Sequence, residues 1–187
     1  MDRREALKRV GAVMGGTLSL PLISGVLAGC GGGGGTAAFV PKTLTADQNE
    51  LVATLSELII PTTDTPGARA AGVNEFIDLM LTDWYAADDR DRFVAGLSTV
   101  NDRARSAHNK AFVDCDEAQQ TAILSQMEQE AMASQGGGKP FFTLLKEMTL
   151  TGYYTSEIGA SQELKYVHVA GYYNGDVPYS EVGRAYS

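Results

Sequence analysis

A repeating apolar pattern in the middle of the chain most restricts what the chain can fold into. From Val73 to Trp84, six apolar residues follow one another at gaps of 3, 1, 3, 1 and 3, which places them on one side of an α-helix. They are Val73, Phe76, Ile77, Met80, Leu81 and Trp84. A helix with a continuous apolar side has to bury that side against other elements. The pattern therefore predicts a helix of a packed helical domain, with Trp84 in the buried set.

Four further segments carry a helical pattern, and short connections separate them. Thr45 and Gln48 have the form of a capping box at the start of the first segment, and Pro140 suits the first turn of the last. No stretch alternates like a β-strand over any length. The sequence predicts an all-α fold, a single helical domain of about five helices over residues 45–158. The additional helices are expected over about residues 45–60, 89–109, 114–135 and 140–150.

Each of these segments has a predicted inner side. The inward residues expected from the spacing are Leu51, Val52, Leu55, Leu58 and Ile59, then Phe93, Leu97, Val100 and Ala104, then Ile123, Leu124, Met127 and Ala131, then Phe141, Leu144, Leu145 and Met148. Between the first two helices, the pair Pro66 and Gly67 fits the central positions of a type II turn.

The first thirty residues have the features of an export signal. The adjacent Arg3 and Arg4 resemble the twin-arginine signal, which directs folded proteins across the bacterial inner membrane. The uncharged residues 10–29 lead to Leu-Ala-Gly-Cys at 27–30, which resembles a lipoprotein signal. We expect residues 1–29 to be removed and Cys30 to carry a lipid on the periplasmic side of a membrane. The alternative is a plain transmembrane anchor, since 20 residues can span a bilayer, although five glycines make this segment weakly apolar.

Residues 30–44 are expected to form a tether between the lipidated cysteine and the domain. They contain an unbroken glycine run at 31–35. Thirteen residues of this composition span about 20 Å r.m.s. as a random coil. A flexible tether of this length keeps the domain close to the membrane.

Charge and cysteine content exclude two classes of protein. Residues 1–29 carry four basic and two acidic side chains, so their removal changes the net charge from −8 to −10. Such an acidic surface repels phosphates, which excludes nucleic-acid binding. The chain has two cysteines, and a lipidated Cys30 leaves Cys115 without an intrachain partner, which excludes a disulfide framework. Cys115 is expected to be a small residue near a helix start.

The last part of the chain, residues 159–187, is expected to be an irregular, tyrosine-rich tail. Seven of the eight tyrosines lie in the last 35 residues, mixed with glycines. Disordered segments are poor in aromatic residues, so the tail is expected to pack on its own domain or on another protein, where tyrosine is enriched. The candidate residues for a partner interface are Tyr153, Tyr154, Tyr166, Tyr172, Tyr173 and Tyr179. For Tyr153 and Tyr154, a role in the core and a role in partner contact are equally compatible with the sequence.

Motifs for redox or hydrolytic chemistry are missing from the sequence. The sequence has no Gly-x-Gly-x-x-Gly after a strand for a dinucleotide and no Cys-x-x-Cys-His for covalent haem. His108 and His168 are the two histidines, and no Gly-x-Ser-x-Gly elbow accompanies them. Two histidines without ligand spacing also make a zinc site improbable. We expect no catalytic residue, no cofactor and no metal site in this chain.

Several segments together resemble one protein family. Residues 55–61 (LSELIIP), 64–68 (DTPGA) and 72–76 (GVNEF), followed by 152–157 (GYYTSE) and 164–166 (LKY), are similar to the gluconate 2-dehydrogenase subunit 3 family. The resemblance extends from about Thr45 to Pro178. It is most specific at its two ends, and residues 90–135 carry little that is diagnostic.

The resemblance implies a non-catalytic accessory subunit. Members of this family accompany exported flavoprotein dehydrogenases of the glucose-methanol-choline type, which hold FAD and often pass electrons to a multihaem cytochrome c. The flavin is inserted in the cytoplasm, so the large subunit must be exported folded, and a small subunit with a twin-arginine signal can carry it through the twin-arginine translocase. The alternative function is a free-standing exported lipoprotein that binds a ligand or an envelope component without a redox partner.

Overall fold

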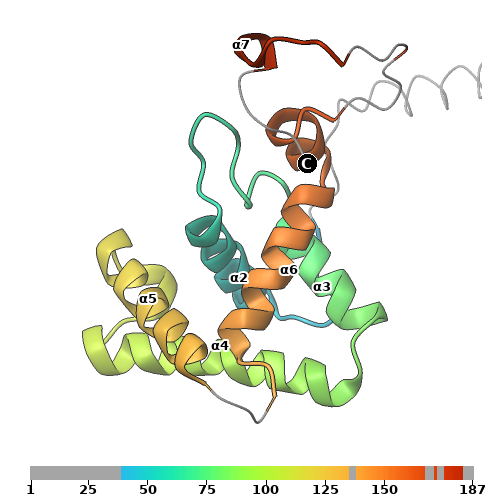
Figure 1. Ribbon diagram of the computed structural model, residues 1–187. Coiled ribbons are helices and arrows are strands. Elements are labelled where there is room, and N and C mark those ends of the chain that lie inside the picture. Colours follow the sequence, from blue (N-terminus) through green and yellow to red (C-terminus); the bar gives the residue numbers. More distant parts are fainter. Residues whose placement is uncertain (1–38, 135–137, 167–170, 172–174, 183–187) are drawn as a thin grey trace, which may run out of the picture. The chain divides into compact units, whose positions relative to one another are not determined.

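The computed structural model describes residues 39–134, 138–166, 171 and 175–182. Its helices are α2 (Ala46–Ile59), α3 (Val73–Asp83), α4 (Ala87–His108), α5 (Glu117–Ala133), α6 (Phe141–Thr155) and the short α7 (Tyr179–Val182). A 3₁₀ turn, η1 (Phe112–Asp114), precedes α5, and a π-helical turn, η2 (Gly159–Glu163), follows α6. No β-strand occurs within these residues. The predicted all-α fold is confirmed, with five long helices as expected (Figure 1).

Two helices begin at capping boxes, which satisfy backbone N–H groups that the first helical turn leaves free. At α2, the Gln48 N–H donates to Thr45 Oγ1 (3.2 Å) and the Thr45 N–H donates to Gln48 Oε1 (2.9 Å), as predicted. At α5, Asp116 and Gln119 form the same reciprocal pair, so this helix starts slightly later than its predicted start near Asp114. Pro140 is the N-cap of α6 and not part of its first turn.

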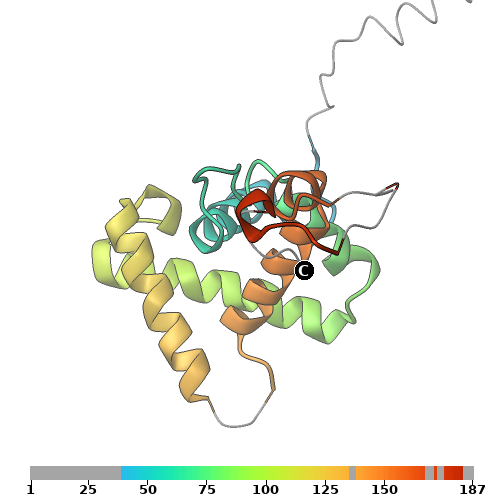
Figure 2. The same cartoon turned by 45° about the horizontal axis from the view of Figure 1, so that its top comes forward.

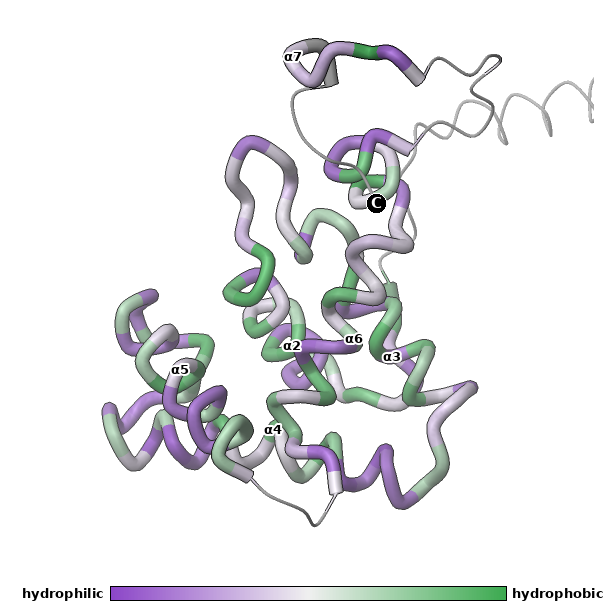
Figure 3. Tube along the Cα trace, in the orientation of Figure 1, coloured by the Kyte–Doolittle hydropathy of each residue, from purple (hydrophilic) through white to green (hydrophobic). Residues whose placement is uncertain are grey.

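Helix α6 connects the other long helices, since it contacts α2, α3, α4 and α5. Figures 1 and 2 both show α6 crossing α4. The inner sides of the helices supply the core, and the predicted inward residues of α4 are all fully buried. Of the residues predicted for α6, Leu145 and Met148 are buried, whereas Phe142 takes the core position that was expected for Phe141. The polar residues of α4 give the purple stretches along its path in Figure 3.

Trp84 departs from the predicted pattern. Val73, Ile77 and Leu81 are fully buried, but Trp84 is 78% exposed. The physical reason is the end of the helix: α3 stops at Asp83, and Trp84 is its C-cap residue with φ −114° and ψ −45°. Trp84 still lies on the helical stripe, because its N–H donates to the Met80 carbonyl oxygen at 3.0 Å, but at this end of α3 its side chain is left largely uncovered. The prediction that Trp84 is buried is therefore wrong.

The connection between α2 and α3 differs from the predicted type II turn. That turn needs a positive φ at Gly67, and Gly67 has none. Glu57 organises this connection, because its carboxylate accepts the N–H groups of Thr62 (2.9 Å) and Arg69 (2.9 Å). A Cβ atom at Gly67 would lie 2.4 Å from Glu57 Oε1 and 2.6 Å from the Thr62 nitrogen. Glycine is thus needed here for close approach and not for its φ angle.

A short strap precedes α2, and α3 holds it. The strap consists of Lys42, Thr43 and Leu44, whose N–H groups all donate to the carboxylate of Asp78 at 2.8 to 3.0 Å. Asp78 is buried, and Thr43 Oγ1 adds a hydrogen bond of 2.7 Å to Thr82 Oγ1, one helical turn further along α3. Hydrogen bonds to an ionised carboxylate are stronger than neutral ones. The point at which the predicted tether meets the domain is therefore fixed on α3.

The described part of the tail is not irregular throughout. The π-helical turn η2 packs against α6, and α7 forms a further helical turn. A Cβ atom at Gly159 would lie 1.9 Å from the Tyr153 carbonyl oxygen, so only glycine fits where η2 meets the end of α6. None of the described helices has both the length and the apolar character that crossing a bilayer requires. Residues 10–29 lie outside the described part of the chain.

Candidate partner-binding surface

Tyr153 belongs to the core and not to a partner interface. Its side chain is 2% exposed, and its hydroxyl donates a hydrogen bond of 2.9 Å to the Pro66 carbonyl oxygen. Burial of a tyrosine is favourable when its hydroxyl has a hydrogen-bond partner of this kind. The residue therefore ties α6 to the connection between α2 and α3. We remove Tyr153 from the candidate interface residues, because its ring offers no surface to another protein.

Other predicted tyrosines lie on the surface. Tyr154 is 41% exposed and its ring stands edge-on to that of Tyr153, with 5.4 Å between ring centroids. Leu150, one turn earlier on α6, is exposed as well, so this helix presents an outward apolar pair. Tyr166 and Tyr179 are mostly exposed. Exposed aromatic side chains are typical of protein interfaces.

The remaining predicted site residues lie outside the described part of the chain. These are Tyr172 and Tyr173 of the tail, Arg3 and Arg4 of the export signal, and the lipidation candidate Cys30. Their roles stay predictions. Cys115 is buried between η1 and α5, and its Sγ lies 3.4 Å from the Ala111 carbonyl oxygen, which agrees with a small residue near a helix start.

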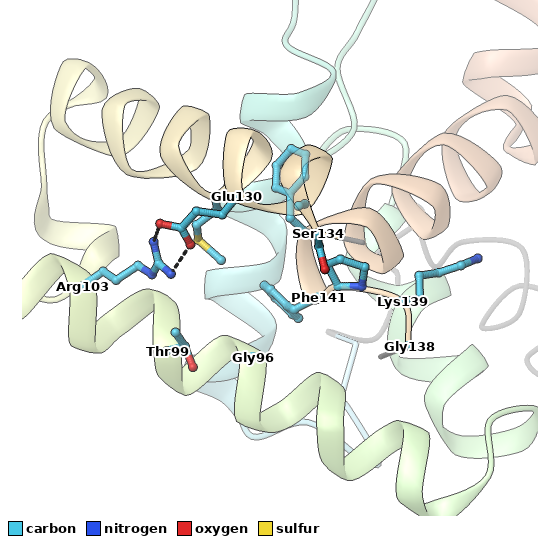
Figure 4. Close-up of a pocket in the computed structure, with 12 residues that line it drawn as sticks. Gly96, Thr99, Arg103, Glu130, Ser134, Gly138, Lys139 and Phe141 are labelled. Carbon is cyan, nitrogen blue, oxygen red and sulfur yellow. Dashed lines mark hydrogen bonds and ion pairs between the residues drawn. The ribbon is translucent and has the colours of Figure 1, made fainter. Parts of the chain in front are cut away.

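A cavity of about 380 Å³ lies where α4, α5 and the start of α6 meet. Figure 4 shows Arg103 and Glu130 at one end, Lys139 at the other and Phe141 between them. Arg103 donates to both carboxylate oxygens of Glu130, at 2.9 and 2.6 Å. This bidentate pairing raises the pKa of Arg103 and lowers the pKa of Glu130. Both groups therefore stay charged and bound to one another.

Lys139 is also paired, although its partner lies outside the cavity. Its Nζ atom is 2.5 Å from Glu147 Oε2, and this hydrogen bond raises the pKa of Lys139. A second cavity, of about 460 Å³, shares Lys139 and Phe141 with the first and includes Tyr85 and Phe93. Because Arg103 and Lys139 each have a carboxylate partner, the first cavity presents no unpaired cation of its lining to a charged ligand.

Within the described residues, no three His, Cys, Asp or Glu side chains gather closely enough to hold a metal ion. His108 is the last residue of α4 and is half-buried. His168 lies outside the described residues. Among the predicted site residues that the structure describes, only the adjacent tyrosines of α6 are in contact with one another.

Two exposed apolar residues of α3 were not predicted from the sequence. Leu79 and Trp84 are both exposed large hydrophobic residues. Leu79 does not belong to the buried stripe of this helix, and an apolar residue outside that stripe was a signal available in the sequence. The exposure of Trp84 had no comparable signal, because it depends on where α3 ends.

Comparison with known proteins gives a family. No curated protein and no solved structure shows significant similarity to the chain. The family model described as gluconate 2-dehydrogenase subunit 3 matches residues 46–171, which include all five long helices and the π-helical turn. This match covers more than half of the chain and agrees with the segments that the sequence analysis singled out. The chain belongs to the gluconate 2-dehydrogenase subunit 3 family.

Proposed function

We propose that this chain is the non-catalytic small subunit of a membrane-associated flavoprotein dehydrogenase complex, and that it assists the export, maturation and anchoring of the catalytic subunit. Family membership is the observation that carries the proposal. The exposed aromatic residues Tyr154, Tyr166 and Tyr179 support it, since they supply contact area for a protein partner. The partner is a flavoprotein of the glucose-methanol-choline type with FAD, and a multihaem cytochrome c is a possible third subunit.

The proposed export route starts from the twin-arginine pair. Arg3 and Arg4 bring this chain to the twin-arginine translocase, and the folded flavoprotein crosses the membrane attached to it. Cys30 then holds the complex on the periplasmic side through a lipid. The hydrogen bonds from the strap to Asp78 support this role, because they fix the end of the tether to a rigid helix. The anchored end of the domain is then attached to α3 by these hydrogen bonds.

The export step is tested by coexpressing the chain with the proposed flavoprotein partner. Replacing Arg3 and Arg4 together by Lys keeps the charge and removes the twin-arginine pair. We expect both proteins to remain in the cytoplasm, as measured by flavin and immunoblot in periplasmic and membrane fractions. The matched control exchanges Lys8 for Arg and Arg9 for Lys, which conserves charge and composition outside the pair, and export should continue.

The same experiment separates the two functions that the sequence left open. If the flavoprotein reaches the periplasm normally while the Lys variant of this chain is retained, the carrier role is wrong. If the wild-type chain is exported but its presence does not change where the flavoprotein is found, the free-standing lipoprotein is favoured.

A further inference from the structure

The second cavity is the larger of the two that share Phe141, with a volume of about 460 Å³. Four of its lining side chains are aromatic or aliphatic, and they come from three parts of the fold. Tyr85 lies in the connection between α3 and α4, Phe93 lies on α4, and Phe141 and Leu144 lie on α6. Sites for small molecules typically have volumes of roughly 300–1,000 Å³ and mostly apolar and aromatic walls. The size and the wall of this cavity therefore suit a small organic ligand.

Helix α4 holds the aromatic wall of the cavity in place. The Phe141 ring is tilted against the ring of Phe93, with 5.2 Å between ring centroids, and Phe93 itself is fully buried. A Cβ atom at Gly96 would lie 2.1 Å from Phe141 Cδ2, which means that the Phe141 ring lies directly against the α4 backbone (Figure 4). A ring that is already fixed on two sides loses little conformational entropy when a ligand covers it. The wall is therefore preorganised for binding.

The charged side chains of the lining are already paired. Arg92 forms an ion pair with Asp89, and Lys139 forms one with Glu147, which does not line the cavity. A charged ligand would have to displace one of these partners and would also lose its own hydration, which costs free energy. An uncharged ligand leaves both ion pairs intact. The charges of the lining therefore favour an uncharged ligand.

The Tyr85 hydroxyl, in contrast, is available to a ligand. Among the described residues, no group forms a hydrogen bond with it, and no described side-chain polar atom is both buried and without a partner, so water reaches this hydroxyl. The Tyr85 N–H donates to the Met80 carbonyl oxygen at 3.0 Å, which fixes the backbone of the residue. A phenolic hydroxyl both donates and accepts, so it can bind either a hydroxyl or a carbonyl group. A purely apolar ligand that covered it would leave it unsatisfied.

We propose that the second cavity binds a small, uncharged aromatic molecule that carries a hydroxyl or carbonyl group. The ring of the ligand packs against Phe141 and Leu144, and its polar group forms a hydrogen bond with the Tyr85 hydroxyl. This site goes beyond the proposed subunit function and does not depend on it, because every residue that forms the site belongs to this chain.

Titration of the detergent-solubilised full chain with 4-fluorophenol, followed by ¹⁹F NMR of the probe, tests the site. The same detergent solution without protein gives the signal of probe in micelles, and we expect saturable binding above that baseline. Tyr85→Phe keeps the ring and removes the hydroxyl, so it should weaken binding of 4-fluorophenol about fivefold, the size of one net hydrogen bond. It should leave binding of fluorobenzene, which has no hydroxyl, unchanged. Tyr154→Phe is the matched control, since Tyr154 does not line the cavity, and it should change neither.

Two further arms test the space and the charge of the cavity. Leu144→Trp places a larger side chain in the cavity and should abolish binding of both probes, with thermal unfolding as the check that the variant is folded. If this variant does not fold, Tyr85→Phe alone decides. The probe 4-fluorobenzoate has the same ring but is an anion at pH 7, and it should bind less tightly than 4-fluorophenol.

The outcomes leave the proposed subunit function untouched. The ligand site is wrong if 4-fluorophenol shows no saturable binding to the wild type, if wild type and Tyr85→Phe bind it equally well, or if 4-fluorobenzoate binds more tightly. It is also wrong if 4-fluorophenol does not bind but Tyr85→Phe weakens association with the flavoprotein. In that case the cavity receives a side chain of the partner and not a free ligand.

Discussion

Helices α3 and α4 both bury one side in the same core, but their outward sides differ. On α4, charged residues pair with neighbours: Arg92 with Asp89, Arg105 with Asp102, and Arg103 with Glu130 of α5. On α3, the exposed acids Glu75 and Asp83 have no ion-pair partner among the described residues, and the exposed Leu79 lies between them on the same side of the helix. A surface whose charged side chains form ion pairs within the chain is typical of one that stays exposed to solvent. A surface with exposed apolar residues and uncompensated charge is suited to a partner.

The largest expected effect contrasts one aromatic residue from each helix. Phe93 of α4 is fully buried, so Phe93→Ala should lower the free energy of unfolding by about 3–5 kcal/mol through lost burial and a residual cavity. Trp84→Ala should lower it by less than about 0.5 kcal/mol, because most of the ring is already in water. Urea unfolding measures both. Similar losses for the two variants would mean that Trp84 is buried and that the comparison is wrong.

The next effect concerns the buried carboxylate of α3. Asp78→Ala removes the acceptor of three strap N–H groups, and we expect a loss of about 2–4 kcal/mol in unfolding free energy. The amides of Lys42, Thr43 and Leu44 should also lose protection from hydrogen exchange. Asp102→Ala on α4 is the control, since it removes only an exposed ion pair, and should cost less than about 0.5 kcal/mol. Unchanged exchange at the strap would show that Asp78 does not hold it.

The bidentate pair between α4 and α5 should contribute less. A double-mutant cycle with Arg103→Ala and Glu130→Ala should give a small coupling free energy, because both side chains are partly exposed to water and exposed ion pairs contribute little to stability. The coupling should shrink further in high salt. A coupling free energy as large as the effect of Asp78→Ala, and insensitive to salt, would contradict the view that this ion pair is a solvated surface pair.

The smallest effect is a pH dependence at the connection that leads into α3. Burial opposes ionisation of Glu57, but hydrogen bonds from Arg69 and Thr62 outweigh it and lower the pKa of Glu57 below the ordinary value of 4.5. Its stabilising contribution is therefore complete above pH 4.5 and lost as the pH falls through the lowered pKa. Glu57→Gln should flatten the stability profile in that acidic range by less than about 1 kcal/mol. If the unfolding free energy depends on pH equally in wild type and variant, Glu57 does not contribute to this pH dependence.

The fold was largely predictable because it depends on local signals. The helical period placed the inner residues of α4, such as Phe93 and Val100, in the core, and the capping box at Thr45 fixed where α2 begins. These features involve residues within one or two helical turns of each other. The inner face of α6 was less certain, since Phe141 and Phe142 are adjacent and either fits the period, and tertiary packing decides between them.

The candidate surface was less predictable because exposure depends on distant contacts. Tyr153 and Tyr154 are adjacent in sequence, yet Tyr153 is buried because its hydroxyl reaches Pro66, 87 residues away. Trp84 continues the buried period in the sequence but lies beyond the end of α3. The prediction of a type II turn at Gly67 was also wrong because of a contact from outside the turn: the Glu57 carboxylate on α2 accepts the N–H groups of Thr62 and Arg69.

The central claim, that this chain is a subunit of a flavoprotein complex, has one direct test. The chain is coexpressed with the proposed flavoprotein partner and purified from detergent-solubilised membranes through a tag on this chain alone. It is then analysed by size-exclusion chromatography with absorbance in the flavin range. The account predicts flavin absorbance that elutes together with this chain in a one-to-one complex. Elution of this chain as a flavin-free monomer, with the flavoprotein in the unbound fraction, would contradict it.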